Sequence, residues 1–271
     1  MKRRLLISTL MLLIAAGTLV AHDLFLRAES YFVPPEGTVR LHVLNGTFSK
    51  SENAVTKDRL RDLSIVNPSG TTTPLDVAGW AETGDTSVVT ARVGESGTYV
   101  IGASLRPREI ALAAKDFNTY LASDGIPDIL AARKASGELD RPAKERYAKH
   151  VKALIQVGAT RTAGYSAELG YPAELVPIDN PYALKPGGTF RVRAVVEGEP
   201  AVNQVVIAGG RTPAGGRIAQ RTVRTDKEGV ARIRVASRGV WYVKFIHMER
   251  AAADTTIDYE SKWATLTFGV R

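Results

Sequence analysis

The sequence contains no cysteine, and only four of its 271 residues are histidine. Without cysteine the chain can form no disulfide, no thiolate metal site, no cysteine nucleophile and no lipid anchor on a cysteine. Aromatic residues are also sparse at 7%, while 24% of residues are charged and 44% are hydrophobic. This composition excludes a disordered, collagen-like or coiled-coil chain and predicts a globular protein.

Long apolar runs are missing except at the N-terminus. There, Leu5–Val20 is uncharged, follows the basic sequence MKRR and ends just before Ala21. The run is shorter than the roughly 20 residues that a membrane-spanning helix needs. It predicts a secretory signal peptide over residues 1–21, cleaved after Ala21. We therefore expect a periplasmic or secreted protein with no stable membrane span after cleavage, a location that fits the lack of cysteine.

The predicted cleavage removes Lys2, Arg3 and Arg4, so the formal net charge falls from +8 to +5. The arginines within residues 211–238 alternate with apolar residues, as on the solvated face of a sheet. No aromatic or motif signal for nucleic-acid binding accompanies them. The charge pattern therefore predicts no nucleic-acid partner.

Residues 22–106 show the alternation that is typical of short β-strands. In Thr38–Val43 every second residue is apolar, which places Arg40 and His42 on the opposite face. Ser87–Val93 and Gly97–Ala103 are separated by a glycine-containing turn. These patterns predict an N-terminal β-sandwich over residues 22–106.

Residues 107–160 change to helical spacing. Apolar residues of Ile110–Leu121 repeat every three or four positions, and Pro127 can start a second helix to about Ala135. Pro142 can start a third helix, which we expect to end near Gly158 and which would carry His150. The segment is therefore predicted to be a helical insertion.

The C-terminal part returns to strands. Residues 161–182 are rich in glycine and proline and are predicted to be a linker. Residues 183–271 fit a second, immunoglobulin- or transthyretin-like sandwich of seven or eight strands. The predicted fold class is mainly β, with two β-sandwich domains and an α-helical insertion between them.

Several segments together resemble a known family. They are, in order, HDLFL (22–26), LVPIDNPYALKPG (175–187), TDKEG (225–229), GVWYVKFIHM (239–248) and ESKWATLTF (260–268). In this order the chain resembles the exported bacterial proteins grouped as domain of unknown function 4198, often labelled a nickel- or cobalt-uptake accessory component. The resemblance implies export, a transthyretin-like C-terminal sandwich, and a membrane metal-uptake component as partner.

Two positions depart from the family's pattern. Phe25 stands where relatives often have tryptophan, and the turn Asn45–Phe48 lacks the histidine that relatives often carry near it. The resemblance therefore implies that any ligand supplied by this turn in relatives is missing here.

Predicted cleavage after Ala21 makes His22 the first residue of the mature protein. A terminal histidine is a two-point ligand, because its free α-amine and its imidazole can chelate one ion together. Nitrogen ligands of this kind suit Ni(II), Co(II), Cu(II) and Zn(II). The sequence thus predicts that His22 binds a divalent transition metal ion.

The chain offers three possible histidine partners for His22. His247 follows Trp241, Val243 and Phe245 on one strand face, which places it at the end of an apolar row. We expect His247 to be the first partner and His42 the second, so the predicted metal ligands are His22, His247 and His42. For His247, His42 and His150 the alternative is a purely structural role.

The predicted function is non-enzymatic metal handling or uptake in the periplasm, since no catalytic motif such as H-E-x-x-H or G-x-S-x-G is present. One alternative is a carbohydrate-binding or adhesion module, in which Trp263 and Tyr242 would be exposed for stacking. The other is a copper enzyme in which His22 and a second histidine form a histidine brace.

Overall fold

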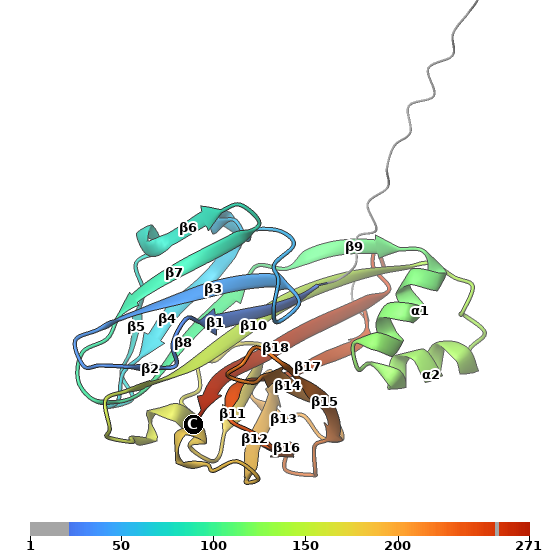
Figure 1. Ribbon diagram of the computed structural model, residues 1–271. Helices are drawn as coiled ribbons and strands as arrows, with labels where there is room; N and C mark the ends of the chain where they lie inside the picture. Colours follow the sequence, from blue (N-terminus) through green and yellow to red (C-terminus); the bar gives the residue numbers. More distant parts are fainter. Residues whose placement is uncertain (1–21, 253–254) are drawn as a thin grey trace, which may run out of the picture.

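The computed structural model describes residues 22–252 and 255–271, so the predicted signal peptide at residues 1–21 lies outside the described residues. The chain forms three layers of β-sheet, with two helices at one end of the central layer (Figure 1).

The central layer is a ten-stranded sheet that contains strands from both halves of the chain. Its strands run across the sheet in the order β15 (Arg217–Arg224), β14 (Val205–Arg211), β17 (Gly239–Arg250), β18 (Tyr259–Val270), β10 (Ala143–Val157), β8 (Gly97–Leu105), β4 (Leu60–Val66) and β5 (Thr72–Pro74). Two further strands, β2 (Phe32–Val33) and β9 (Arg108–Leu112), also pair with β10. The parallel pair of β10 and β18 joins the two halves.

A four-stranded N-terminal sheet covers one face of the central layer. Its strands are β1 (Asp23–Ala28), β3 (Thr38–Gly46), β7 (Thr86–Arg92) and β6 (Trp80–Thr83). The Thr265 and Thr267 hydroxyls of β18 donate to the carbonyls of Leu24 and Leu26 on β1. Leu24 and Leu26 are fully buried beside them, so β1 lies directly on the central sheet.

A smaller sheet covers the opposite face. Its strands are β11 (Ala173–Pro177), β12 (Thr189–Val196), β13 (Glu199–Pro200) and β16 (Val230–Arg234). Phe190 of β12 packs on Phe268 of β18 with ring centroids 4.7 Å apart, and both are fully buried. The predicted mainly β fold with paired sheets is confirmed, and both outer sheets share the central one.

The helices α1 (Ala114–Ser123) and α2 (Pro127–Ala135) form the helical insertion. Phe117 of α1 packs on Tyr259 of β18, and the ring of Tyr120 stacks on Trp263 in the same cluster. Four short 3₁₀ turns complete the described elements: η1 (Lys57–Arg59), η2 (Val77–Gly79), η3 (Ala163–Ser166) and η4 (Pro181–Ala183).

The prediction of a third helix from Pro142 to Gly158 is wrong, because this segment is the long strand β10. Its apolar residues fit a helical stripe and also a two-residue alternation. Four other strands pair with β10, so tertiary pairing overrides the local pattern. Pro142 stands just before the strand, where the missing N–H costs no ladder hydrogen bond.

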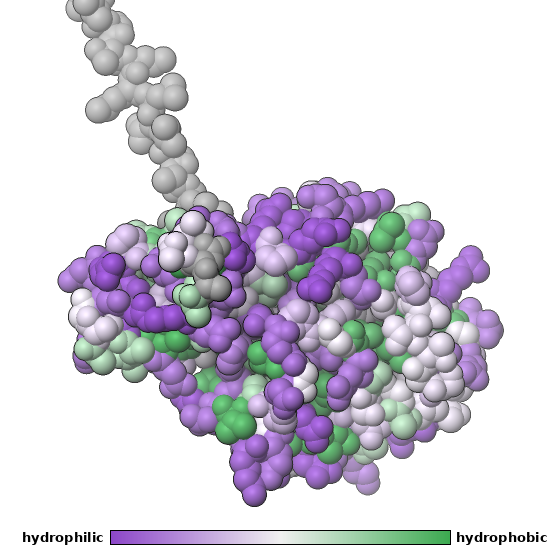
Figure 2. All heavy atoms as spheres, turned by 180° about the vertical axis from the view of Figure 1, so that it is seen from behind, coloured by the Kyte–Doolittle hydropathy of each residue, from purple (hydrophilic) through white to green (hydrophobic). Residues whose placement is uncertain are grey.

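The outer surface is mixed in character. On the face turned away from the viewer in Figure 1, hydrophilic and hydrophobic residues are interspersed (Figure 2). Among the described residues, the large hydrophobic side chains that are well exposed are Val77 and Val202. No helix in residues 22–252 or 255–271 is long and apolar enough to cross a membrane.

Candidate functional site

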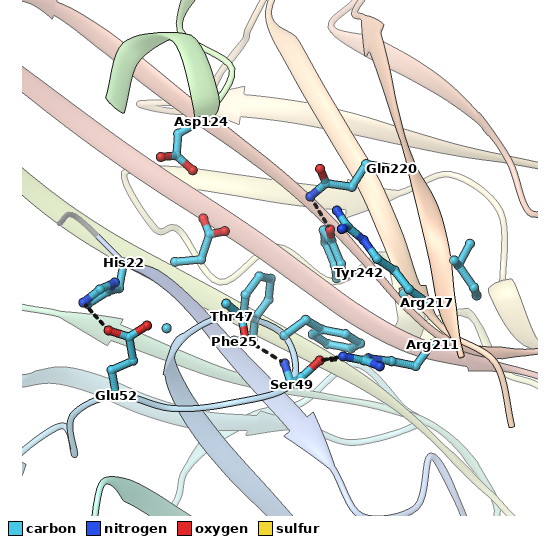
Figure 3. A pocket seen from close by; sticks show the side chains of 15 residues that line it. His22, Phe25, Thr47, Ser49, Glu52, Asp124, Arg211, Arg217, Gln220 and Tyr242 are labelled. Atoms are coloured by element: carbon cyan, nitrogen blue, oxygen red, sulfur yellow. Dashed lines mark hydrogen bonds and ion pairs between the residues drawn. The ribbon is translucent and has the colours of Figure 1, made fainter. Parts of the chain in front are cut away.

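A cavity of about 580 Å³ opens beside the first described residue, His22. We call it the N-terminal pocket. Strand β1, the turn after β3, the end of α1 and strands β14, β15 and β17 all contribute to its wall. Figure 3 shows His22 and Glu52 on one side of the pocket and Arg211 and Arg217 on the other.

The imidazole of His22 is held by a carboxylate. Its Nε2 lies 3.0 Å from Oε2 of Glu52, in the segment that follows the β3 turn. Because this contact uses Nε2, Nδ1 remains on the side of the ring nearest the backbone nitrogen of the same residue. A carboxylate on one ring nitrogen is the usual way in which proteins orient a metal-binding histidine.

The backbone of His22 is also fixed. Buried Lys149 on β10 donates from Nζ to the carbonyl oxygen of His22 and, at 3.3 Å, to Oδ1 of Asn45. Its ammonium lies 5.0 Å from the Trp263 ring centroid. Burial lowers the pKa of Lys149 to about 8. Two independent contacts thus hold His22 at the pocket wall.

Next to His22, a buried ion-pair network includes two residues of the pocket wall, Asp23 and Asp124. Nζ of Lys244 on β17 lies 2.6 Å from Asp23 and 3.1 Å from Asp124. Burial raises the pKa of Asp23, and Lys244 offsets part of that rise. Burial alone would lower the pKa of Lys244, but the two carboxylates outweigh it and raise the pKa. The ammonium therefore stays protonated between them.

One oxygen of this network is left without a partner. Oδ1 of Asp23 is buried and, within the described part of the chain, accepts no hydrogen bond. An unsatisfied carboxylate oxygen is costly to bury. Since Asp23 lines the N-terminal pocket, this oxygen suits a cation or a hydrogen-bond donor bound there.

Aromatic rings form the floor between the two sides of the pocket. Phe25, Phe48 and Tyr242 pack together with ring centroids 4.9 to 5.2 Å apart. The Tyr242 hydroxyl accepts a hydrogen bond from Nε2 of Gln220 at 2.7 Å. Burial raises the pKa of Tyr242, so the phenol is neutral near pH 7.

The far side of the pocket is positively charged. Arg211 donates from Nε to Oγ of Ser49 at 2.8 Å and from a terminal nitrogen to the Gly215 carbonyl at 2.8 Å, which fixes its guanidinium. Arg217, at the start of β15, is exposed at the pocket wall. Its positive charge offsets part of the rise in the pKa of Tyr242, which lines the same pocket.

The predicted partner His42 lies elsewhere. On β3 it pairs with Arg27 of β1, five residues along the strand from His22, or roughly 16 Å at the usual strand rise. Its Nε2 lies 3.0 Å from Oε1 of Glu29. The prediction that His42 faces away from the buried row of β3 agrees with the observed burial pattern.

His247 lies on the other face of the central sheet. Lys244 of β17 points toward Asp23, and His247, three positions on, points the opposite way. Its Nδ1 lies 3.2 Å from Oε1 of Gln204, whose Nε2 donates to two backbone carbonyls. Nδ1 is therefore the donor, and burial lowers the pKa of His247.

The fourth histidine, His150, is buried on β10 rather than on a helix. Its Nδ1 lies 2.9 Å from Oγ of Ser104, and Nε2 has no partner among the described residues. Burial lowers the pKa of His150 to about 4. His150 directly follows Lys149 in the strand, and neighbouring strand residues point to opposite faces. Since Lys149 contacts His22, His150 points away from His22.

The structure therefore brings none of the other three histidines to His22. In residues 22–252 and 255–271 there is also no group of three or more histidine, aspartate or glutamate side chains arranged to hold a metal ion. Trp263 is buried away from the pocket, and Tyr242 is largely buried with one side at the N-terminal pocket, so the two rings form no shared stacking platform on the outer surface.

The residues around His22 carry weak sequence signals. Glu52 lies in a polar turn, and Lys149 and Lys244 each lie within an apolar strand, where a buried lysine needs a partner. Lys244 gives the clearest of these signals: it lies on the strand face opposite to Val243 and Phe245, which indicates a buried charge that needs an acidic partner. Its partners Asp23 and Asp124 are far away in sequence and could not be deduced from it.

Comparison with known proteins places the chain in a family. A family model described as a domain of unknown function (DUF4198) matches residues 19–249, and the chain belongs to this family. The match confirms the resemblance found in the sequence. The family description assigns no activity to its members.

The other comparisons add little. A search of curated proteins found no match. Among solved structures, the crystal structure of a tetra-tandem repeat in the extending region of a large adhesion protein is 13% identical, with a TM-score of 0.25. The match covers 92% of this chain and 49% of that one, so the chain spans about half its length. A likeness this distant supports no conclusion about this chain.

Proposed function

We propose that this DUF4198 protein is an exported, non-enzymatic protein that binds a divalent transition metal ion at its mature N-terminus and assists metal handling or uptake. The proposal requires cleavage after Ala21, which frees the α-amine of His22. The α-amine and Nδ1 of His22 then chelate the ion together in a six-membered ring. Nickel, cobalt, copper and zinc all accept nitrogen ligands of this kind.

One observation carries the proposal. Glu52 contacts Nε2 of His22 at 3.0 Å and so orients the ring while Nδ1 stays available. The Lys149 contact to the His22 carbonyl fixes the backbone of the same residue. Both atoms needed for the chelate therefore belong to a residue that is already positioned, which lowers the entropy cost of binding.

The electrostatics of this side of the pocket favour a cation. Glu52, Asp23 and Asp124 contribute three carboxylates, and Lys244 between the two aspartates and Lys149 at the His22 carbonyl offset two of these charges, which leaves about one net negative charge. The unpartnered oxygen of Asp23 adds a site of negative charge beside His22. Loading of the metal in the periplasm and delivery to a membrane uptake component complete the proposed function.

The placement of the histidines favours this function over a copper enzyme. A histidine brace needs a second imidazole beside the terminal one. His42 lies roughly 16 Å from His22 along the sheet. His247 lies on the face of β17 opposite to Lys244, and His150 lies on the face of β10 opposite to Lys149, so both point away from His22. We therefore assign no second histidine ligand.

The test is an extension of the mature terminus by one alanine before His22. This variant keeps the imidazole but moves the α-amine away from Nδ1. We expect its affinity for Ni²⁺, measured by isothermal titration calorimetry, to fall at least tenfold. The variant His247→Ala is the matched control and should bind like the wild type. Equal affinity in the extended variant would contradict the proposal.

A further inference from the structure

The N-terminal pocket is much larger than a bare metal ion requires. Its volume of about 580 Å³ falls in the range of small-molecule sites, roughly 300 to 1,000 Å³. The aromatic floor of Phe25, Phe48 and Tyr242 lines the pocket beyond the proposed chelate at His22. The pocket thus has room for an organic molecule beside the metal.

The protein contributes few ligands to the ion. His22 supplies two nitrogen atoms, Glu52 is engaged at Nε2, and one oxygen of Asp23 is engaged with Lys244. Late transition metals in proteins are commonly held by four or more donors. Some coordination positions of an ion on His22 therefore point into the pocket, where a bound molecule can fill them.

The opposite side of the pocket suits a carboxylate. Arg211 is fixed there by Ser49 and by the Gly215 carbonyl, and Arg217 presents its guanidinium at the wall. Figure 3 shows both guanidinium groups across the aromatic floor from His22. Arginine is the residue best suited to bind a carboxylate through two parallel hydrogen bonds.

We propose that the pocket binds the metal as a complex with a small organic carboxylate chelator, and this rests on the proposed function. The ion sits on the α-amine and Nδ1 of His22. The chelator completes its coordination, lies over the aromatic floor and directs a carboxylate to Arg217, with Arg211 beside it.

The charges around the pocket should make the binding of the metal ion and the binding of the chelator cooperative. A chelator without metal, charged or not, has no bond to His22. An anionic chelator such as citrate without metal would also bring its negative charge close to Glu52, Asp23 and Asp124, of whose three charges Lys244 and Lys149 offset two, so that about one remains to repel it. A metal ion neutralises that charge and removes the repulsion. The pocket should therefore bind metal and chelator together more strongly than either one alone.

The experiment uses the mature protein and the probes Ni²⁺, citrate, free histidine, and the two 1:1 nickel complexes. Titration calorimetry gives the affinities, and native mass spectrometry shows whether a ternary complex forms. We expect at least one complex to bind tenfold or more tightly than Ni²⁺ alone. Neither chelator should bind measurably without the metal.

The variant Arg217→Gln tests the carboxylate end. It should weaken binding of the nickel complex at least tenfold and change the affinity for Ni²⁺ alone less than twofold. Arg221→Gln is the matched control, because it removes the same charge from the same strand, and Arg221 is not among the residues that line the pocket. Both positions are exposed, so the variants should fold.

Each other outcome has a definite meaning. If Ni²⁺ binds and both chelators only strip it from the protein, the inference is overturned while the proposed function stands. If a chelator binds equally well without metal, the pocket is a carboxylate site and the inference is again overturned. If neither Ni²⁺ nor either complex binds, the proposed function itself fails.

Discussion

At the scale of single residues, the orientation of the His22 imidazole depends on Glu52. The substitution Glu52→Gln removes the charge that holds Nε2. Loss of such a carboxylate partner typically weakens metal binding 10- to 100-fold. We expect a loss of this size for Ni²⁺ in titration calorimetry.

Glu29→Gln is the matched control, because Glu29 holds His42 at the same distance in the same way. It should leave Ni²⁺ affinity unchanged. If the two variants weaken binding equally, the effect is one of overall charge and Glu52 has no special role.

We expect Lys244 to contribute mainly to the free energy of unfolding of the protein. The substitution Lys244→Met leaves Asp23 and Asp124 facing each other without their shared cation. Breaking a buried ion pair in this way costs about 3 to 5 kcal/mol. Urea denaturation should show this loss.

For comparison, Lys262→Met removes a lysine that pairs with the exposed carboxylate of Glu197, and the expected cost is below about 1 kcal/mol. Equal losses in the two variants would show that the Lys244 network contributes no more than a surface pair.

His22 could be proposed from the sequence because the predicted cleavage after Ala21 would make it the first residue of the mature protein. Glu52, Lys149 and Lys244 could not be assigned to it. Lys149 meets His22 across 127 positions and Lys244 meets Asp23 across 221, so these contacts exist only once the sheets have assembled. Alternation correctly placed His247 on the face of Trp241, Val243 and Phe245, but the sequence does not show that His22 lies on the opposite side of β17, where Lys244 points.

At the scale of secondary structure, β10 shows where local pattern is insufficient. Strands such as β3, with one buried face and one polar face, follow from alternation alone. Most of β10 is buried on both faces, and its polar residues His150, Lys152 and Gln156 lie in the interior. Its sequence therefore lacks a clear period, and the pairing that makes it a strand is non-local.

Burial of His150 on β10 makes stability depend on pH. Its pKa is about 4 in the folded chain and about 6.5 when unfolded. Between these values only the unfolded chain binds the proton, so stability falls as the pH is lowered from about 6.5 to about 4. The full loss is about 3 kcal/mol and levels off below pH 4.

Urea denaturation at pH 7, 5 and 4 can test this dependence. The variant His150→Gln has no imidazole to protonate and should lose about 3 kcal/mol less than the wild type between pH 7 and pH 4. An equal decline in both proteins would assign the pH dependence to other groups.

At the scale of the whole molecule, the ten-stranded central sheet ties the two sandwiches together. β10 and β18 pair over nine registered positions, and both outer sheets pack on β18. The two halves should therefore unfold in one cooperative step. Far-UV circular dichroism and tryptophan fluorescence should give coincident urea transitions.

The buried Trp80 of the N-terminal sheet provides the control for this prediction. Trp80→Phe should shift both signals together, since it weakens a single cooperative unit. A separate early transition seen only by one probe would show that the halves unfold independently.

The most direct test of the central claim is native mass spectrometry of the full-length protein, expressed with its predicted signal peptide and purified from the periplasm. We predict a mass that begins at His22 and carries one divalent transition metal ion after loading with nickel, cobalt, copper or zinc. A chain that begins at His22 and binds none of the four ions would contradict the account. A chain that begins at another residue would remove the terminal amine on which the proposed chelate depends.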